Sequence, residues 1–483
     1  MQRSNRFILL LGGLLVVQFL AMAFFPLADT SEPRYAAIAR LMSESGDWIT
    51  PFFSPGVPFW GKPPFSFWVQ ALSLDVFGIN EWAVRLPSWL ATLASLFLVY
   101  QVTDMLYGKL AAQRATLIYG SCGLVFIVGG AVLTDPFFAL GTTLCMVAPL
   151  LVSRGASKWW GYGFFVGLAV GLLSKGPLVF VLVGGVLPFL YLFYPASRVF
   201  WNRLPWVTGI LLLVALGLPW FVLAELKTPG FIDYFIVGEH FKRFIEPGWA
   251  GDLYGSAHRE TYGMIWAFWA QAALPWSPVA LVLLVIALAK RAGRVALRQA
   301  VADPYIAYFF VWASLTPAFF TISGNILWTY LLPALPAFAI LMARALSFEH
   351  WPWSASTQRL GRLMGLACVA PVLIASVVVA ATINPNLVKT EKGLVAYFQE
   401  QADEKDEFFY LHQVPFSARF YSGESARAIS NDQVRQKVLA GEPLWVAIPK
   451  GDALLAQDWI QTEGQLRYEN LRYQFYEFQP VIN

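Results

Sequence analysis

The chain has 483 residues, of which 57% are hydrophobic and only 13% are charged. A soluble domain carries about a quarter charged residues, so this composition excludes an ordinary soluble protein and indicates a chain that crosses a membrane many times. The net charge of +4 is too diffuse along the sequence to suggest a nucleic-acid partner.

Apolar runs of about 20 residues recur along the chain, and a helix of this length crosses about 30 Å of hydrocarbon. The first run resembles a signal peptide, but it is longer than a typical one and no clean cleavage site follows, so we expect a retained helix. Residues 64–80 are aromatic-rich, short and interrupted by Asp75, which favours a helix lying in the membrane interface, with a tilted crossing as the alternative. The predicted spans are residues 7–25, 86–105, 114–133, 136–153, 160–173, 177–194, 205–224, 263–289, 305–321, 326–345 and 363–383.

Basic residues predict the orientation of these spans, because cytoplasmic loops carry an excess of Lys and Arg. Arg3 and Arg6 place the N-terminus in the cytoplasm, and alternate threading then puts basic residues into every one of the inner loops. Those loops hold Lys109 and Arg114; Arg154 and Lys158; Arg198 and Arg203; Lys290, Arg291, Arg294 and Arg298; and Arg344, Arg359 and Arg362. The outer face then holds residues 26–85, Thr134 and Asp135, Lys175, the 225–262 loop, residues 323–325 and everything after about residue 384.

The sequence changes character after about residue 384. The segments "EFFYLHQV", "PLWVAIP" and "LRYQFYEF" are rich in the aromatic and β-branched residues typical of strands. Ser430 can cap a helix over "NDQVRQKVLAG", which Gly441 ends. We therefore expect a membrane domain over residues 1–384, whose outer loop 26–85 carries functional motifs, and a small extracytoplasmic α/β domain over residues 385–483.

Three acidic side chains lie at predicted helix ends on the outer face. Asp29 and Glu32 directly follow the first span, and Asp135 opens the apolar helix that begins "DPFFAL". Ionisable groups at membrane depth are costly and tend to be functional, although an acid at a helix exit costs little. For the first two, the alternative is a polar collar at the headgroups. For Asp135 it is a favourable interaction with the helix dipole, with Pro136 at the first helical position.

Two lysines stand before prolines on the same face. In "FWGKPPFSFW" the prolines stiffen the backbone around Lys62, so its ammonium is expected at a set position. The stretch "LLSKGPLVF" presents Lys175 in a similar way. Either lysine could instead snorkel to lipid headgroups, and for Lys175 we favour that interpretation.

The 225–262 loop combines acids, cations and histidines. Its motif-like residues are Glu239, His240, Lys242, Arg243, His258 and Arg259. Arg and Lys suit a phosphate, while His can donate a proton or bind a metal. Acids and cations on one face suggest a phosphorylated lipid whose phosphate is the leaving group. An acid would activate the attacking group, and the cations would stabilise the departing phosphate.

A transporter or lipid-linked sugar flippase is the main alternative from another functional class. That alternative predicts charges near the bilayer midplane, broken helices in paired positions and repeat symmetry. Here the charges gather in outer loops beside an appended outer domain, which favours an enzyme.

A set of stretches, ordered along residues 29–341, resembles the polyprenyl-phosphate-dependent membrane glycosyltransferases of the GT-C type. The likeness is strongest to the family of protein O-mannosyltransferases and lipid A aminoarabinose transferases. It implies an α-helical polytopic membrane protein of the bacterial inner membrane, with about 11–13 transmembrane helices and a periplasmic C-terminal α/β domain. The stretches are "DTSEPRYAAIARLMSESGDWITP", "FWGKPPFSFW", "FGINEWAVRLPS", "TDPFFAL", "LSKGP", "EHFKRF" and "TYLLPALPAFAIL".

The resemblance also implies a reaction. A sugar carried on undecaprenyl phosphate would pass, with inversion, to lipid A or another glycolipid in the outer leaflet, with a protein acceptor as the alternative. The essential carboxylates would be Asp135 and either Asp29 or Glu32. The donor phosphate would be bound by Arg34, Lys62, His240 and Arg243, with further donor contacts from Tyr35, Lys175, His258 and Tyr330.

The sequence departs from the family at two places. The family commonly has an Asp-Glu pair just before the Arg-Tyr, whereas here Ser31 and Glu32 stand there and Asp29 lies two residues before Ser31. Either of the two acids could therefore inherit the catalytic role. Members close to the aminoarabinose enzymes carry an acid before the Lys of the Lys-Pro motif, where this chain has Gly61, so a divalent metal is left open as a cofactor.

Overall fold

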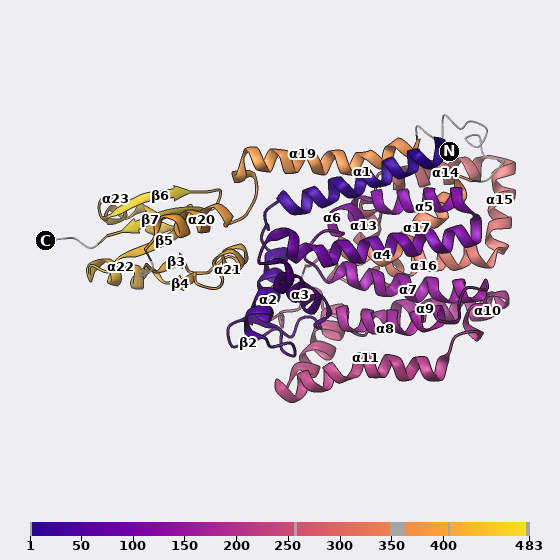
Figure 1. Cartoon of the computed structure of the whole chain (residues 1–483), viewed down its shortest axis with the longest axis horizontal. Helices are drawn as coiled ribbons and strands as arrows, with labels where there is room; N and C mark the ends of the chain where they lie inside the picture. Colours follow the sequence, from indigo (N-terminus) through magenta and orange to yellow (C-terminus); the bar gives the residue numbers. More distant parts are fainter. Residues whose placement is uncertain (1, 256–257, 348–362, 404–405, 480–483) are drawn as a thin grey trace.

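The computed structural model describes residues 2–255, 258–347, 363–403 and 406–479. A large bundle of helices makes up most of the molecule, and a smaller region of mixed helices and strands lies at one end of it (Figure 1). The N-terminus lies at the opposite end of the bundle from this smaller region (Figure 1).

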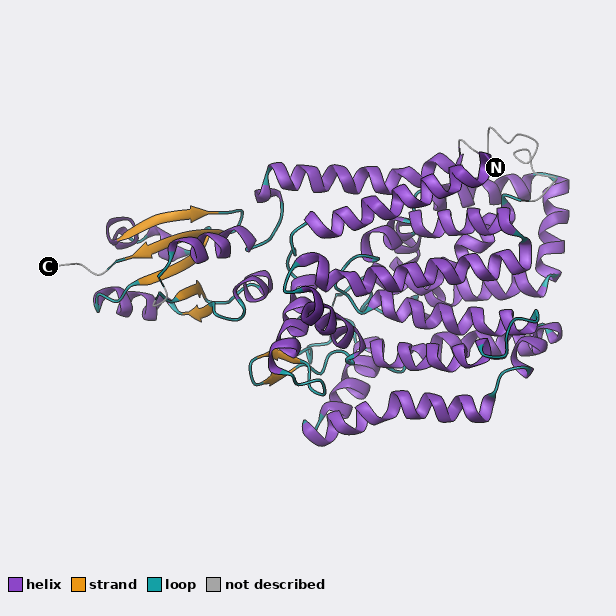
Figure 2. Cartoon of the chain, in the orientation of Figure 1, coloured by secondary structure: helices purple, strands orange, loops and turns teal. Residues whose placement is uncertain are grey.

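Most of the bundle helices run side by side along the long axis of the molecule (Figure 2). A helix satisfies its own backbone hydrogen bonds, as a segment surrounded by lipid must. The helices of this part are α1 (Gln2–Phe24), α4 (Glu81–Tyr107), α5 (Lys109–Ser121), α6 (Gly123–Val128), α7 (Asp135–Ser153), α8 (Trp160–Lys175), α9 (Leu178–Phe193), α10 (Arg198–Asn202), α11 (Trp206–Lys227), α13 (Met264–Ala272), α14 (Trp276–Ala289), α15 (Arg291–Ala302), α16 (Pro304–Phe320), α17 (Leu335–Ala345) and α19 (Val369–Ile383). The 3₁₀ helices are η1 (Pro195–Ser197), η3 (Trp328–Ala334), η4 (Gly365–Cys368) and η5 (Pro385–Leu387).

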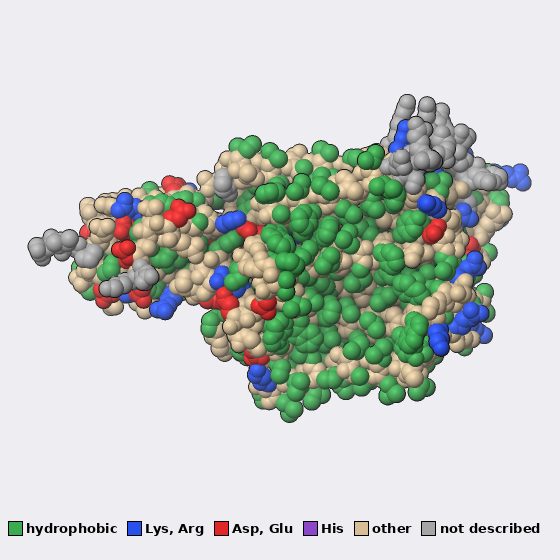
Figure 3. Space-filling model, in the orientation of Figure 1, with side chains coloured by type: hydrophobic (Ala, Val, Ile, Leu, Met, Phe, Trp, Pro, Cys, Tyr) green, Lys and Arg blue, Asp and Glu red, His purple; other side chains and the backbone are tan. Residues whose placement is uncertain are grey.

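The bundle has the dimensions and the surface of a membrane domain. In the described part of the chain, 6 helices are long and apolar enough to cross a membrane, and there are up to 7 if the bent pair α13–α14 is one span. Shorter apolar helices, among them α9 and α16, lie between them. Hydrophobic side chains cover most of the visible face of the bundle (Figure 3). The chain is therefore a multi-pass membrane protein, as its composition predicts.

Two predicted spans are interrupted. The run 114–133 is divided between α5 and α6, because the N–H of Gly123 donates to the carbonyl of Leu274 in place of a helical partner. The run 263–289 bends by 104° between α13 and α14. Pro275 lies at this bend and has no backbone N–H with which to continue the helix. The prediction of one continuous helix is wrong in both cases.

Basic side chains gather at the end of the bundle where the N-terminus lies (Figure 3). The helix α15, which carries Arg291, Arg294 and Arg298, runs across this end at a steep angle to the other helices (Figure 1). The opposite end holds the segments that the sequence analysis groups on the outer face. Arg359 and Arg362, which also belong to the predicted inner loops, lie outside the described residues.

The outer segments form a cap over one end of the bundle. They include α2 (Ser31–Ser45), the hairpin β1 (Phe52–Ser54) and β2 (Val57–Pro58), α3 (Phe65–Phe77), the π-helix η2 (Asp233–Lys242) and α12 (Arg243–Ile245). The predicted interfacial helix over residues 64–80 is α3, whose 13 residues are too few to cross the hydrocarbon. The cap has its own hydrophobic core, which includes Leu27, Tyr35, Phe67 and Tyr254.

The C-terminal region (residues 385–479) contains a five-stranded sheet in the order β4-β3-β5-β7-β6. The strands β4, β3 and β5 are parallel, β7 is antiparallel to β5, and β6 is antiparallel to β7. The strands are β3 (Phe408–Leu411), β4 (Arg427–Ile429), β5 (Leu444–Pro449), β6 (Gly464–Glu469) and β7 (Tyr473–Phe478). The helices are α20 (Lys392–Gln401), α21 (Phe416–Ser422), α22 (Asn431–Leu439), η6 (Ala453–Ala456) and α23 (Asp458–Glu463).

The three segments predicted as strands contain β3, β5 and β7. Ser430 caps α22 as predicted, because its hydroxyl accepts from the N–H of Gln433 and its own N–H donates to the Gln433 side chain. The sequence patterns do not predict β4 and β6, which are the two edge strands of the sheet. Most of their side chains are exposed, so they lack the buried alternating pattern that identifies a strand.

Candidate active site

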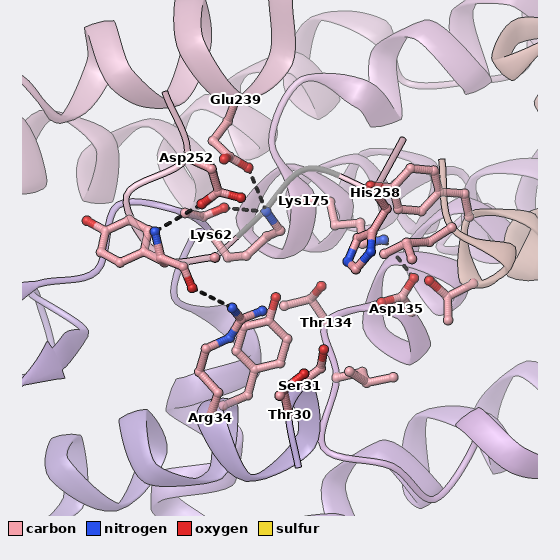
Figure 4. A pocket seen from close by; sticks show the side chains of 18 of the residues that line it. Thr30, Ser31, Arg34, Lys62, Thr134, Asp135, Lys175, Glu239, Asp252 and His258 are labelled. Carbon is pink, nitrogen blue, oxygen red and sulfur yellow. Dashed lines mark hydrogen bonds and ion pairs between the residues drawn. The ribbon is translucent and has the colours of Figure 1, made fainter. Parts of the chain in front are cut away.

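A cavity of about 450 Å³ opens beneath the cap of outer segments. Residues from distant parts of the sequence line it, including α2, the loop before α3, the start of α7, the end of α8, the 225–262 loop and η3 (Figure 4). Its charged lining residues are the acids Asp135, Glu239 and Asp252 and the cations Arg34, Lys62, Lys175 and Arg243. The cavity thus gathers side chains that the sequence analysis places on one face.

Asp135 and Lys175 form a buried ion pair at the cavity wall. Asp135 is the first residue of α7 and Lys175 is the last residue of α8, so two adjacent helix ends bring them together. The Nζ of Lys175 donates to Oδ1 of Asp135 at 2.7 Å, and each side chain is only 9% exposed. The favoured interpretation of Lys175 as a snorkelling residue is therefore wrong, because its ammonium points to a carboxylate inside the protein.

The turn after α8 explains the position of Lys175. Gly176 has a φ of 73°, which favours glycine, and it ends the helix immediately after the lysine. A Cβ at Gly176 would lie within 2.9 Å of the rings of Phe235 and His240. The π-helix η2 therefore packs directly on this turn and holds the end of α8 against the cavity.

Lys62 belongs to a second charged cluster in the cavity. Its Nζ donates to Oε2 of Glu239 at 3.1 Å and to the Gly61 carbonyl at 2.5 Å. The Nη1 of Arg243 donates to Oε1 of Glu239 at 2.9 Å and lies 3.3 Å from Oδ2 of Asp252. Glu239 is thus held between two cations, and its side chain is only 4% exposed. The π-helix, a form that is frequent at functional sites, ends just before Arg243.

Burial and the neighbouring charges shift the pKa values of Glu239 and Lys62 in opposite directions. Burial alone would raise the pKa of Glu239, but the charges of Lys62 and Arg243 lower it further than burial raises it. Burial alone would lower the pKa of Lys62, but the charge of Glu239 raises it above its usual value. Both side chains are therefore charged near neutral pH. The cations are held at fixed positions where an incoming anion would meet them.

Arg34 lies on the other side of the open centre of the cavity from Lys62 and Glu239 (Figure 4). Its Nη1 donates to the Tyr254 carbonyl at 2.8 Å. Its guanidinium carbon lies 5.2 Å from the ring centroid of Tyr35, and its buried Nε has no hydrogen-bond partner among the described residues. In the part of the chain that the structure describes, no carboxylate forms an ion pair with Arg34, so this residue brings an uncompensated positive charge to the cavity.

Glu32, one of the two candidate acids of the first outer loop, does not line the cavity. Both of its carboxylate oxygens accept from Arg85 at 2.7 Å, and Oε1 also accepts from the N–H of Val132 at 3.1 Å. The Arg85 side chain is 3% exposed, so it needs a partner that neutralises its charge. Glu32 therefore joins α2 to the start of α4 instead of facing the open centre.

Asp29, the other candidate acid, also lies outside the cavity lining. Its carboxylate accepts from the N–H and the hydroxyl of Ser417 and from the guanidinium of Arg472. All of these partners belong to the C-terminal region. Among the carboxylates that the sequence analysis proposes as catalytic, the structure thus brings only Asp135 into the cavity, in the described residues.

The two predicted histidines differ in their positions. The ring nitrogens of His240 lie 2.8 Å from the carbonyl oxygens of Phe235 and Lys175, and this histidine does not line the cavity. It joins η2 to the end of α8. His258 does line the cavity, and burial together with the charges of Arg243 and Arg34 lowers its pKa. A lowered pKa keeps this imidazole neutral near neutral pH, where it can accept a proton.

Aromatic rings complete the lining. Tyr35 and Tyr330, both predicted as donor contacts, lie in the cavity wall. Tyr254, Phe59 and Phe416 lie there as well, and the rings of Phe59 and Tyr254 are 4.7 Å apart. Burial raises the pKa of Tyr254 to about 12, so its phenol is protonated and donates to the carbonyl of Pro58.

Sequence reasoning did not select several of these lining residues. The sequence pattern indicates Glu239 beside Arg243 without a role for it, and it does not point to Asp252 or Tyr254. The available signal was their position, because all of them fall in the 225–262 loop that the threading places on the outer face. Their pairing with Arg34 and Arg243 depends on the fold of that loop, which the sequence pattern does not show.

The described residues contain no group of three or more His, Cys, Asp and Glu side chains that could hold a metal ion. Gly61 supplies no ligand at the position where the resemblance implies an acid, and a Cβ at this position would lie 2.8 Å from the ring of Phe59. The residues present therefore do not fit the metal site that the resemblance left open, and we derive no step through a metal.

Comparison with known proteins gives this cavity a context. Residues 61–222 match the family model described as dolichyl-phosphate-mannose-protein mannosyltransferase. The "undecaprenyl phosphate-alpha-4-amino-4-deoxy-L-arabinose arabinosyl transferase" of Yersinia enterocolitica is 30% identical over 344 residues, covering 69% of this chain and 58% of the relative. The same-named protein of Pseudomonas paraeruginosa is 31% identical over 352 residues, covering 69% and 59%. The chain thus spans less than two thirds of the length of these relatives.

Solved structures show the same architecture. The crystal structure of ArnT from Cupriavidus metallidurans bound to undecaprenyl phosphate matches with a TM-score of 0.79 at 18% identity, covering 98% of both chains. Its apo state matches with a TM-score of 0.75. This likeness confirms the predicted fold, a polytopic helical membrane protein with a small C-terminal sheet region. The chain therefore shares its fold with ArnT, and over 344–352 residues its sequence is similar to those of the aminoarabinose transferases.

Proposed function

We propose that this protein transfers a sugar from a polyprenyl-phosphate donor to an acceptor of the cell envelope. The observation that carries the proposal is a cavity lined by the cations Lys62, Arg243 and Arg34 and by the carboxylate of Asp135. Cations held at fixed positions suit a phosphate, and a nearby carboxylate suits the activation of a hydroxyl. The adjoining apolar bundle suits the lipid part of the donor.

The relatives support the nature of the substrates. Several carry a name that specifies an undecaprenyl phosphate-linked aminoarabinose donor, and the similar ArnT structure is bound to undecaprenyl phosphate. We therefore propose undecaprenyl phosphate as the lipid carrier and lipid A or another glycolipid as the acceptor. A protein acceptor is the second candidate, because the family model that matches residues 61–222 describes protein mannosyltransferases.

The proposed reaction is a single displacement with inversion. Lys62 and Arg243 bind the donor phosphate, and Asp135 accepts the proton of the acceptor hydroxyl as its oxygen bonds to the anomeric carbon. The bond between that carbon and the phosphate oxygen breaks, and its electron pair leaves with the phosphate. The cations stabilise the charge that grows on the phosphate, a contribution that is often the largest in such reactions.

Before the donor binds, Glu239 compensates the charges of Lys62 and Arg243. Donor binding must therefore rearrange these ion pairs. The phosphate competes with Glu239 for Lys62 and Arg243, and a cation that turns toward it leaves its carboxylate partner less tightly paired. Lys175 remains beside Asp135 and fixes the orientation of its carboxylate. This assignment gives the catalytic role to Asp135, and it gives Asp29 and Glu32 supporting roles outside the cavity.

The cavity would face the periplasm from the inner membrane. The basic end of the bundle would lie in the cytoplasm, in accord with the excess of Lys and Arg in cytoplasmic loops. The C-terminal region would then be periplasmic. This orientation places the active site beside the outer leaflet, where a lipid-linked donor and a glycolipid acceptor can both reach it.

Mass spectrometry of lipid A and of other envelope glycans, in a strain with the gene deleted and in its parent, tests the proposal. We expect one sugar substituent to disappear in the deletion strain and to return with the wild-type gene but not with Asp135→Asn. If lipid A and the other glycolipids are unchanged in the deletion strain and a protein glycan is lost instead, the result would favour the protein acceptor. No change in any envelope glycan would contradict the proposed transfer.

A further inference from the structure

One wall of the cavity comes from the C-terminal region. Phe416, the first residue of α21, lines the cavity together with residues that lie more than 80 positions earlier in the chain. Its ring centroid lies 5.7 Å from the guanidinium carbon of Arg34 and 5.6 Å from the ring of Phe53. Phe416 is therefore packed at the Arg34 side of the cavity.

The residue after Phe416 is held by Asp29. Oδ1 of Asp29 accepts from the N–H of Ser417 at 2.8 Å, and Oδ2 accepts from the Ser417 hydroxyl at 2.6 Å. The N–H of Asp29 donates to the carbonyl of Lys389 at 2.8 Å. One residue of the first outer loop thus fixes both the start of α21 and the chain that enters the C-terminal region.

Arg472 joins this contact to a second buried carboxylate. Its Nη2 donates to Oδ2 of Asp29 at 2.5 Å and to Oε1 of Glu391 at 2.6 Å. The Asp29 side chain is 2% exposed and that of Glu391 is 0% exposed. Removing one member of such a buried group leaves an unpaired charge, which is strongly unfavourable. The three side chains therefore fix the relative position of the two regions more firmly than a surface contact would.

Further contacts hold the other end of α21. The hydroxyl of Tyr421 donates to Oε1 of Glu81 at 2.9 Å and accepts from the N–H of Leu27 at 2.9 Å. The Nη1 of Arg40 donates to the carbonyl of Phe420, whose ring is buried in the core of the cap. The whole helix is thus anchored to the cap, and Phe416 cannot move from the cavity unless these contacts break.

We infer that the C-terminal region forms a working wall of the active site, in which Phe416 contacts the transferred sugar and Asp29 is a positioning residue that holds Phe416 there. This inference rests on the proposed function. The phosphate is held at Lys62 and Arg243, so the sugar extends toward the open centre and the Arg34 side. An aromatic ring offers an apolar face to the C–H groups of a sugar, and it excludes water from the reacting centre.

A double-mutant cycle separates positioning from direct catalysis. Phe416→Ala and Asp29→Asn should each lower kcat/KM by roughly 10- to 100-fold, because a displacement of about 1 Å in a reacting group can cost 10²-fold. The double variant should be no worse than Phe416→Ala alone, since Asp29 acts through Phe416. Arg472→Lys should retain much of the activity that Arg472→Gln loses. Arg467→Gln, which breaks the surface pair with Glu477 in the same sheet, should have no effect.

Two outcomes of the cycle would overturn the inference. Losses that multiply in the double variant would show that Asp29 and Phe416 act independently. A loss of about 10²–10⁴-fold in Asp29→Asn, with nearly full activity in Phe416→Ala, would identify Asp29 as the general base instead. If Asp29→Asn does not fold, Ser417→Ala takes its place, because it removes one of the hydrogen bonds of Asp29 and leaves every carboxylate intact.

A labelling experiment tests the wall without any sugar transfer. Phe416→Cys and the control Leu439→Cys, an exposed residue of α22, are made in a chain in which the exposed Cys368 is replaced by Ser. A short-chain polyprenyl-phosphate sugar should slow the reaction of Phe416→Cys with a maleimide at least several-fold and leave Leu439→Cys unchanged. If Phe416→Cys reacts with the maleimide at equal rates with and without the lipid-linked sugar, Phe416 does not lie in a wall of the donor site. If the lipid-linked sugar protects Phe416→Cys from the maleimide but the protein transfers no sugar, the result contradicts the proposed function and leaves the inference about the wall intact.

Discussion

The ammonium of Lys62 lies 3.1 Å from the carboxylate of Glu239 in a cavity that we propose binds a phosphate. The positive charge of the lysine is therefore balanced by Glu239 before the donor arrives. This pairing lowers the cost of burying the charge, since the Lys62 side chain is only 23% exposed. It also means that donor affinity reflects a competition between the phosphate and Glu239.

Removal of this competitor should strengthen donor binding. Glu239→Gln keeps the size of the side chain but takes away the charge that pairs with Lys62 and repels a phosphate. We expect undecaprenyl phosphate to bind up to about tenfold more tightly, which corresponds to about 1.4 kcal/mol. A titration of the purified variant measures this directly, with Glu477→Gln in the C-terminal sheet as a matched control. Weaker binding would show that Glu239 supports the phosphate site instead of competing for it.

Removal of the cation should have the opposite effect. Lys62→Ala should weaken binding of a polyprenyl-phosphate sugar by about 1.5–3 kcal/mol, the usual contribution of a charge-assisted hydrogen bond. Lys62→Arg should also impair transfer, because a planar guanidinium does not fit a position set for a compact ammonium. Donor titrations and turnover in detergent give both values. If both variants bind and turn over like the parent, Lys62 serves only as an anchor.

Asp29, Arg472 and Glu391 form a joint between the cap and the C-terminal region. The stability of this joint should depend on pH. Burial raises the pKa of Glu391, and Arg472 only partly lowers it. The folded pKa thus lies above the unfolded value of 4.5. The folded state holds this proton more tightly, so the contribution of Glu391 to stability falls as pH rises from about 4.5 through the raised pKa.

We therefore expect Glu391 to make the C-terminal region more resistant to proteolysis at pH 5 than at pH 7. The comparison is made between the parent and Glu391→Gln, because other carboxylates titrate in both proteins. The variant should lose this part of the pH dependence. The same pH dependence in parent and variant would mean that Glu391 does not control the joint.

Sequence patterns predict some parts of this site better than others. The short motifs at predicted helix ends point to Lys62 and Asp135, and both residues line the cavity. Asp29 and Glu32 were placed in the site on the same grounds, but the structure pairs them with Arg472 and Arg85. Those partners lie far away in the sequence, and local patterns do not reveal such pairings.

The fold shows the same limit. Apolar length and basic loops predicted the membrane bundle and the grouping of the outer segments. The interruption at Gly123 depends on a hydrogen bond to the distant carbonyl of Leu274, and no local property of the 114–133 run shows it. The interpretation of Lys175 as a snorkelling residue fails for a similar reason, because its partner Asp135 belongs to another helix.

The orientation in the membrane has its own test. Ser54→Cys and Ser422→Cys should react with an impermeant maleimide in intact spheroplasts, since both residues belong to the face proposed to be periplasmic. Ala292→Cys in α15 should react only after the membrane is permeabilised. All three are made with Cys368 replaced by Ser. Protection of the first two sites, or labelling of the third in intact spheroplasts, would reverse the proposed orientation.

Sugar transfer by the purified protein tests the central claim most directly. The protein in detergent is incubated with a short-chain polyprenyl-phosphate sugar and with lipid A, and the products are measured by mass spectrometry. We predict transfer by the parent and a loss of about 10²–10⁴-fold in Asp135→Asn, the usual contribution of a general base. The folded state of the variant is checked by its elution and thermal unfolding. Undiminished transfer by a folded Asp135→Asn protein would contradict the assignment of this carboxylate. The absence of transfer from any polyprenyl-phosphate sugar to glycolipid or protein by the parent would contradict the account as a whole.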